Sequence, residues 1–220
     1  MGFEIKNEIV DQISEFAYYA DMSANANLKR RIIETKKEYR SDFTKRFTGF
    51  MNGPLSSGLS AETIHVPHKK KKKSGCDTTI IITSKGLSKV ALYKNKYPNF
   101  GDPSHNWDKP KKETEKSLYT SQLKRQKKYR DKFAVFQKFI SNQLKVEHQH
   151  MAKETASCVW HSDVVIFNQH YRKTPEDIWS TENLLDMFHI TKSTDIGSIL
   201  KSVCLCLDAD PILIQNVIED

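Results

Sequence analysis

The sequence predicts an α/β (α+β) protein in which a small mixed β-sheet is flanked by helices. Two observations on patterning support this class: apolar residues at helical spacing occupy the first fifty residues, and short β-branched runs follow them. The third observation is size, because 220 residues with 38% hydrophobic side chains can bury one core. The expected order is two helices, two strands, a helix, a strand and further helices.

The first fifty residues are expected to form two helices. Their apolar residues recur every three or four positions, with a polar break near 23–27, so each pattern gives one buried helix face. Gly49, Gly53 and Pro54 end the second pattern. The apolar positions are Ile5, Ile9, Ile13, Phe16, Ala20, Leu28, Ile32, Tyr39, Phe43, Phe47 and Phe50.

A loop and then a β-hairpin are expected next. Segment 51–75 is rich in glycine, proline and serine and ends in five consecutive lysines, which is typical of a loop. The runs 78–83 and 89–93 are short, branched and apolar, and a glycine-containing turn separates them, which predicts a hairpin. Segment 97–116 is rich in Pro, Gly, Asp and Lys and is expected to be an exposed loop.

The second half of the chain is expected to return to helices around one more strand region. Apolar spacing between Lys- and Arg-rich faces predicts a single helix over 117–146. One further buried strand is expected from the runs 158–160 and 164–167. Thr-Pro-Glu-Asp at 174–177 is typical of a helix start and leads into a helix ending near 188.

Charge is distributed unevenly in this chain of formal net charge +8. Residues 1–150 hold 30 basic and 16 acidic side chains, whereas residues 151–220 hold 5 and 11. A basic face of this kind favours a polyanion as partner, and a solvated lysine-rich surface is the alternative. We expect a single domain over 1–220: N-terminal helices at 1–50, a core with the basic segments at 51–170, and an acidic helical section at 171–220.

Neither a membrane span nor a secreted disulfide framework is expected. No run approaches about 18 apolar residues, and the first residues lack the layout of a signal peptide. The cysteines form no CxxC pair, so we expect reduced thiols in a cytoplasmic protein. P-loop, GxGxxG and Ser-His-Asp patterns are missing from the sequence, which argues against nucleotide switches, dehydrogenases and serine hydrolases. The cysteines are Cys76, Cys158, Cys204 and Cys206.

One constellation joins an acidic residue to a pair of lysines. Asp77 opens the first strand of the predicted hairpin, and Lys94 and Lys96 close the second. Antiparallel pairing brings those two ends together, and residues two apart on a strand face the same side. A carboxylate and ammonium groups are therefore expected at one rim of the sheet, beside the polylysine segment.

This arrangement resembles the PD-(D/E)xK nuclease superfamily, which includes most type II restriction endonucleases. In that family a first acid begins one strand, and an acid-x-lysine triplet lies in the next. The resemblance covers roughly residues 70–170. It includes Gln122 and Gln126 on the following helix, where the family often supplies a polar residue behind the site. The resemblance also implies a glutamate from the preceding helices, for which Glu34 and Glu38 are the candidates.

The resemblance implies an endonuclease that hydrolyses phosphodiester bonds at specific double-stranded DNA sites with Mg²⁺. Asp77 matches the metal-ligating carboxylate, and Lys96 matches the lysine that orients water or stabilises developing charge. Lys94 stands where the family carries Asp or Glu, and an ammonium cannot ligate Mg²⁺. Either a natural relative has lost its activity, or the residue was changed deliberately to silence a toxic enzyme. The otherwise intact setting favours the second interpretation.

A homodimer is expected from the same resemblance, because one small site per chain must cut two strands. The acidic section 171–220 would face away from DNA and is the candidate dimer surface. Two other interpretations stay open: a non-catalytic nucleic-acid-binding protein whose Asp77, Lys94 and Lys96 are structural, and a repair or transposition nuclease on the same fold.

Two basic segments are candidate DNA contacts. Five consecutive lysines lie just before Asp77, and further basic residues follow the hairpin. Phosphate contact would position DNA without reading its sequence. A disordered loop and an ordinary solvated helix face are the respective alternatives. The candidates are Lys69, Lys70, Lys71, Lys72, Lys73, Lys124, Arg125 and Lys128.

Overall fold

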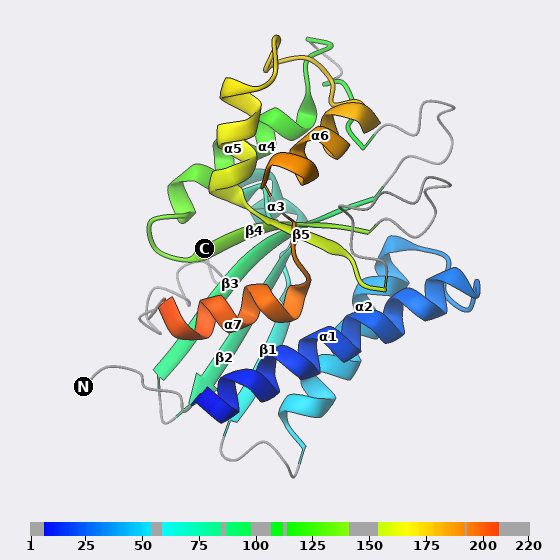
Figure 1. The fold of residues 1–220 in the computed structure, drawn as a ribbon, viewed down its shortest axis with the longest axis vertical. Helices are drawn as coiled ribbons and strands as arrows, with labels where there is room; N and C mark the ends of the chain where they lie inside the picture. The colour runs from blue at the N-terminus through cyan, green and yellow to red at the C-terminus, as the bar shows by residue number, and fades with distance from the viewer. Residues whose placement is uncertain are drawn as a thin grey trace.

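The computed structural model describes residues 7–53, 59–84, 87–97, 107–111, 114–140, 154–191 and 193–206. In this part of the chain a five-stranded mixed sheet is flanked by seven α-helices, which confirms the predicted fold class (Figure 1). The elements are α1 (Asn7–Lys29), α2 (Lys36–Met51), β1 (Leu59–His65), α3 (His68–Ser74), β2 (Thr78–Ser84), β3 (Leu87–Lys96), α4 (Leu118–Gln126), η1 (Lys127–Tyr129), β4 (Ala134–Phe139), β5 (Ser157–Trp160), α5 (His161–His170), α6 (Thr181–Thr191) and α7 (Ile196–Cys206).

The strands lie in chain order across the sheet, β1 to β5. The first three strands are antiparallel, β4 runs parallel to β3, and β5 is antiparallel to β4. The predicted hairpin is confirmed as β2 and β3, with Thr78 opposite Tyr93. A parallel pair needs a crossover, and α4 lies in the connection from β3 to β4.

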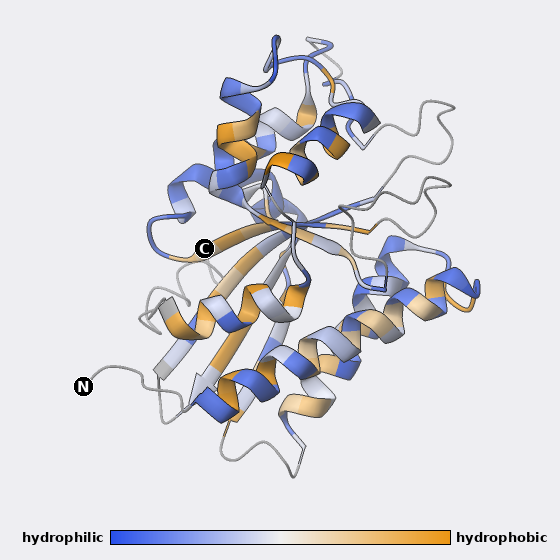
Figure 2. Cartoon of the chain, in the orientation of Figure 1, coloured by the Kyte–Doolittle hydropathy of each residue, from blue (hydrophilic) through white to orange (hydrophobic). Residues whose placement is uncertain are grey.

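Helices cover both faces of the sheet. The helices α1, α2 and α7 lie on one side, and α4, α5 and α6 gather on the other (Figure 1). Alternate strand residues divide between these sides, since Ile80 and Tyr93 join the core with α1, α2 and α7, whereas Ile81 and Leu92 join a separate cluster. Hydrophobic residues accordingly run along the strands and recur along α1 and α7 (Figure 2).

A buried ion pair ties α1 to the sheet. Lys138 of β4 pairs with Asp21 of α1, and both side chains are fully buried. Tyr39 donates its hydroxyl to Asp21 Oδ1 at 2.5 Å, and the Ala156 amide donates to Asp21 Oδ2 at 2.8 Å. Burial, followed by the charge of Asp21, raises the pKa of Tyr39 well above its usual value. A buried charge persists only when it is paired in this way, so the network fixes how α1, α2 and β4 pack.

The predicted helix over 117–146 is wrong beyond its first third. It ends as α4 at Gln126, and β4 follows after one turn of 3-10 helix. Every residue of β4 is buried between β3 and β5, so the strand shows no polar alternation. Its apolar residues therefore imitate helical spacing, and residues 141–146 lie outside the described part.

Other boundaries also differ from expectation. The strand predicted from 158–160 and 164–167 is confirmed only in its first run, which lies within β5, whereas 164–167 belongs to α5. The expected loop 51–75 contains β1 and α3, and the helix expected from 174 begins only at Thr181. In the predicted exposed loop 97–116, Trp107 and Asp108 are buried.

The two N-terminal helices are confirmed, but their break is at 30–35 rather than 23–27. The second helix begins with a capping box, in which Thr35 and Glu38 exchange side-chain and backbone hydrogen bonds. No helix within the described ranges is long and apolar enough to cross a membrane. Cys76, Cys158 and Cys204 are buried free thiols, as predicted, and the Cys206 side chain lies outside the described part.

Candidate functional site

Asp77 is held rigidly where α3 turns into β2. Gly75 ends α3 with φ +77°, a left-handed conformation that favours glycine. A Cβ there would lie 2.7 Å from the Gln122 carbonyl oxygen, so glycine also permits α3 to approach α4. The Asp77 amide then donates to the Tyr93 carbonyl at 3.0 Å, and its carbonyl accepts from the Val66 amide at 3.1 Å. The residue is thereby fixed between β1 and β3.

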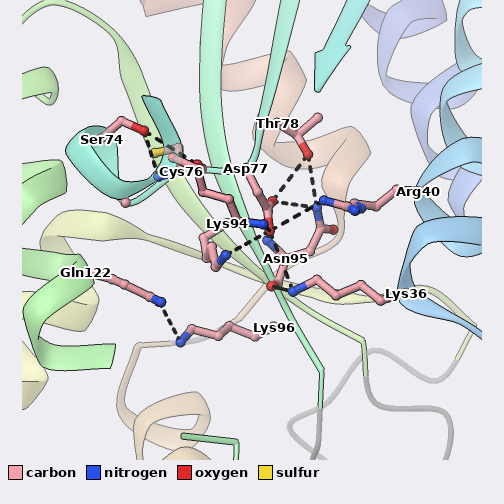
Figure 3. Close-up of polar contacts among 12 residues, drawn as sticks. Lys36, Arg40, Ser74, Cys76, Asp77, Thr78, Lys94, Asn95, Lys96 and Gln122 are labelled. Carbon is pink, nitrogen blue, oxygen red and sulfur yellow. Dashed lines mark hydrogen bonds and ion pairs between the residues drawn. The ribbon is translucent and has the colours of Figure 1, made fainter. Parts of the chain in front are cut away.

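Both oxygens of the Asp77 carboxylate are occupied by hydrogen bonds (Figure 3). Oδ1 accepts from the amide and the side-chain nitrogen of Asn95, each at 3.0 Å, and from the Thr78 hydroxyl at 3.3 Å. Oδ2 accepts from the Lys94 ammonium at 3.0 Å. The carboxylate itself is fully buried.

Three further cations converge on the same oxygen. Lys36 Nζ lies 3.6 Å from Asp77 Oδ2, Arg40 Nη1 lies 3.8 Å from it, and Lys71 Nζ lies 3.9 Å from it. Lys36 and Arg40 are one turn apart on α2, and Lys71 comes from α3. We call these residues, together with Lys94 and Asp77, the Asp77 cluster. Four cations thus surround one carboxylate.

The cluster is closed on one side and accessible on the other. Asp77 has no exposed side-chain surface and Lys94 retains 9%, whereas Lys36 and Lys71 retain 32% and 34%. The exposed members lie on α2 and α3, so the excess positive charge faces outward from the strand ends. Approaching solutes meet cations first, with the carboxylate behind them.

These residues do not fit a magnesium ion. Mg²⁺ is held by carboxylates and water oxygens, and cations at 3 to 4 Å from its ligand repel it. The lone pairs of Asp77 are already used by Asn95, Thr78 and Lys94. Across the described residues, no group of three His, Cys, Asp or Glu side chains is placed to hold a metal. The predicted metal ligand therefore serves as the counter-ion of a cationic cluster.

Lys96 is bound to α4 rather than to Asp77. Its ammonium donates to Gln122 Oε1 at 3.0 Å and lies 3.5 Å from the centre of the Tyr119 ring. Burial lowers the pKa of Lys96 well below its usual range, and the repulsion of Lys94 adds to this effect while Asp108 opposes it. Of the two glutamines singled out on α4, Gln122 is thus the one that contacts Lys96, whereas Gln126 donates to the Gly75 carbonyl and accepts from Gln137.

The crowding of charge shifts the ionisation of the cluster. Burial favours the neutral form of Asp77, but attraction to Lys36 and Lys94 outweighs it and holds the Asp77 pKa well below its usual value. Desolvation, with further lowering by Lys94, Lys71 and Arg40, takes the pKa of Lys36 to about 7 although Asp77 opposes the shift. Desolvation and Lys94 also lower the pKa of Lys71.

Several predicted site residues lie elsewhere. Glu38 is exposed and its carboxylate accepts from the Glu34 and Thr35 amides, so it caps α2 and does not join Asp77. Lys124 pairs with Glu176 at 2.6 Å on an exposed surface.

The basic candidates fall into two groups. The five lysines lie on α3, where the predicted loop is a helix, and Lys71 is the member that reaches Asp77. The remaining candidates belong to the α4–η1 region on the opposite side of the cluster from α2: Lys124, Arg125 and Lys128.

Sequence reasoning missed Lys36 and Arg40. The sequence did contain a signal for them, because Lys36 and Arg40 lie on the side of α2 that carries the buried residues of this helix, Tyr39 among them. Where that helix meets the sheet could not be derived from the pattern. No known protein family and no curated protein matches this chain.

Proposed function

We propose that this chain binds double-stranded DNA through its phosphates, on a framework similar to PD-(D/E)xK nucleases. With lysine at position 94, it does not cleave the DNA with Mg²⁺. One observation carries the proposal: four cations converge within 4 Å of a single buried carboxylate oxygen. An arrangement with this excess of positive charge attracts phosphate and repels a divalent cation. Lys94 takes the place of the acid that the family carries there.

The placement of the neighbouring elements supports the nuclease-like framework. Asp77 directly precedes β2, which pairs with β3, the strand that carries Lys94 and Lys96. The following helix α4 supplies Gln122, which accepts from Lys96. The basic excess over 1–150 supports a polyanionic partner. A homodimer on double-stranded DNA stays a prediction of the same proposal.

The test is a matched pair of charge removals on α3. Lys71→Gln removes a cation of the Asp77 cluster, and Lys72→Gln removes an exposed cation from the next position. Fluorescence anisotropy with a labelled duplex of arbitrary sequence should show a loss of affinity of about fivefold or more for Lys71→Gln, in keeping with a phosphate contact. The loss for Lys72→Gln should be smaller. Equal binding by both variants and the unaltered chain would overturn the proposal.

A second candidate function is the nuclease itself, silenced by Lys94. It is favoured by one contact, because Lys94 donates directly to the Asp77 carboxylate from the position where the family carries its second acid. Lys94→Glu removes this hydrogen bond and supplies a second carboxylate. If the chain is a silenced nuclease, the folded variant should cut plasmid DNA with Mg²⁺, and the added change Asp77→Asn should abolish the cutting.

A further inference from the structure

We propose that the Asp77 cluster takes a phosphomonoester at the end of a nucleic-acid strand in preference to an internal phosphodiester. The inference rests on the proposed DNA binding and names the group that this site holds. Two observations support it: the cations of the cluster all lie close to Asp77 Oδ2, and they outnumber its single carboxylate.

The geometry favours a single compact anion over a stretch of backbone. Ammonium and guanidinium groups from α2, α3 and β3 all lie 3.0 to 3.9 Å from Asp77 Oδ2. A DNA strand spreads its charges, with about one phosphate per 3.4 Å of helix axis, so cations that follow it are spaced out along a track. Side chains from three elements that all reach one atom lie close to one another, so together they can contact one compact, highly charged group placed beside Asp77.

The charge balance favours a dianion. Even with Lys36 neutral, the cations Arg40, Lys71 and Lys94 outnumber the single Asp77 carboxylate, and the excess of positive charge is more than one phosphodiester charge matches. A phosphomonoester carries nearly two negative charges above its second pKa of about 6 and offers three acceptor oxygens. One donor of the cluster is also unused, since the Arg40 Nε is buried and no hydrogen-bond acceptor within the described residues reaches it.

Lys36 gives the bound state a signature. Its ammonium faces Asp77 just before β2, Lys94 of β3, Lys71 of α3 and Arg40 of its own helix, and it donates to the Asn95 carbonyl at 2.5 Å. His65 at the end of β1 lies among the same charges, and desolvation keeps its pKa below the usual value, so it is neutral at pH 8. A dianion beside Lys36 adds negative charge there and so stabilises the protonated form of its side chain. Binding at pH 8 should therefore take up a proton on Lys36.

The experiment compares one short duplex with a 5′-phosphate or a 5′-hydroxyl by calorimetry at pH 8, in two buffers of different ionisation enthalpy. We expect the phosphorylated end to bind about tenfold more tightly, with uptake of up to about one proton per end. Lys36→Arg should keep the preference and lose the uptake, because arginine stays charged. Lys37→Gln, one residue away and exposed, should change neither.

Three outcomes would count against the inference and leave DNA binding itself intact. Equal affinity for both ends shows that the cluster holds internal phosphates. Proton uptake that persists in Lys36→Arg places the titrating group elsewhere. Inorganic phosphate serves as a separate arm, used at concentrations too low to screen DNA binding by ionic strength alone. Competition by phosphate against the 5′-phosphorylated duplex supports a monoester site. Failure of phosphate to compete contradicts it.

Discussion

The Asp77 side chain holds together a group of cations that would otherwise repel one another. We predict that Asp77→Asn destabilises the fold by about 3 kcal/mol or more, because removing one partner leaves buried positive charge uncompensated. Urea unfolding measures this change. Asp131→Asn is the control, since the exposed Asp131–Arg130 pair should contribute less than about 1 kcal/mol. Equal stability of Asp77→Asn and the unaltered chain would show that the cations do not depend on Asp77.

The same residues predict how stability depends on pH. The Asp77 pKa is lower in the folded chain than in the unfolded one, so its contribution is present above about pH 4 and is lost as the pH falls through the acid range. Lys36 acts in the alkaline range: its pKa is about 7 when folded, so the unfolded chain binds more protons between about pH 7 and 10, and stability rises with pH there.

Lys36→Met tests the alkaline part of this prediction. The variant should be more stable than the unaltered chain at pH 7 and should show a smaller rise in stability between pH 7 and 10. Chemical unfolding at several pH values measures the slope. An unchanged slope would mean that Lys36 is protonated normally in the folded chain.

At the scale of elements, the contact between α3 and α4 determines where Asp77 lies. We predict that Gly75→Ala costs about 1 to 3 kcal/mol and weakens DNA binding, because a Cβ would meet the Gln122 carbonyl in a left-handed conformation. Gly49→Ala within α2 is the matched control, since a Cβ there meets nothing within 4 Å and should stabilise the helix slightly. A neutral Gly75→Ala would show that α3 can move without consequence.

Sequence patterns identified elements well where one helix face is buried or a turn signal separates short strands. The N-terminal helices were predicted from the helical spacing of their apolar residues. The hairpin was predicted because two short β-branched runs flank a glycine turn, although β2 and β3 are themselves buried on both faces over most of their length. The pattern failed at β4, whose residues are buried on both faces and so carry no period of their own. It also failed at α3, because five lysines have no apolar face, and the helix depends on its capping by Gly75.

Asp77 and Lys94 were predicted to meet because hairpin register is local information. The convergence of Lys36 and Arg40 on the same carboxylate was not predicted, since it depends on how α2 packs against the sheet from about forty residues away in sequence. The interpretation of Lys94 changes accordingly. In the sequence it stands out as one misplaced cation, whereas in the structure it is one of four.

At the scale of the whole molecule, the basic excess over 1–150 should govern affinity for DNA. Binding that rests on phosphate contacts releases counter-ions, so affinity for duplex DNA should fall by about tenfold or more between 50 and 200 mM salt. Anisotropy titrations over that range measure the slope. Arg40→Gln should make the plot of log affinity against log salt concentration less steep, by the amount expected for the loss of about one phosphate contact. A flat salt dependence would exclude the backbone as the main partner.

The most direct test of the central claim is lysine footprinting by acetylation and mass spectrometry, with and without duplex DNA. The informative comparison is between neighbours on α2: Lys36 faces Asp77, whereas Lys37 is exposed. We predict that DNA protects Lys36 and Lys71 from acetylation and leaves Lys37 reactive. Protection confined to Lys124 and Lys128, with Lys36 and Lys71 as reactive as in the free protein, would contradict the assignment of phosphate binding to the Asp77 cluster.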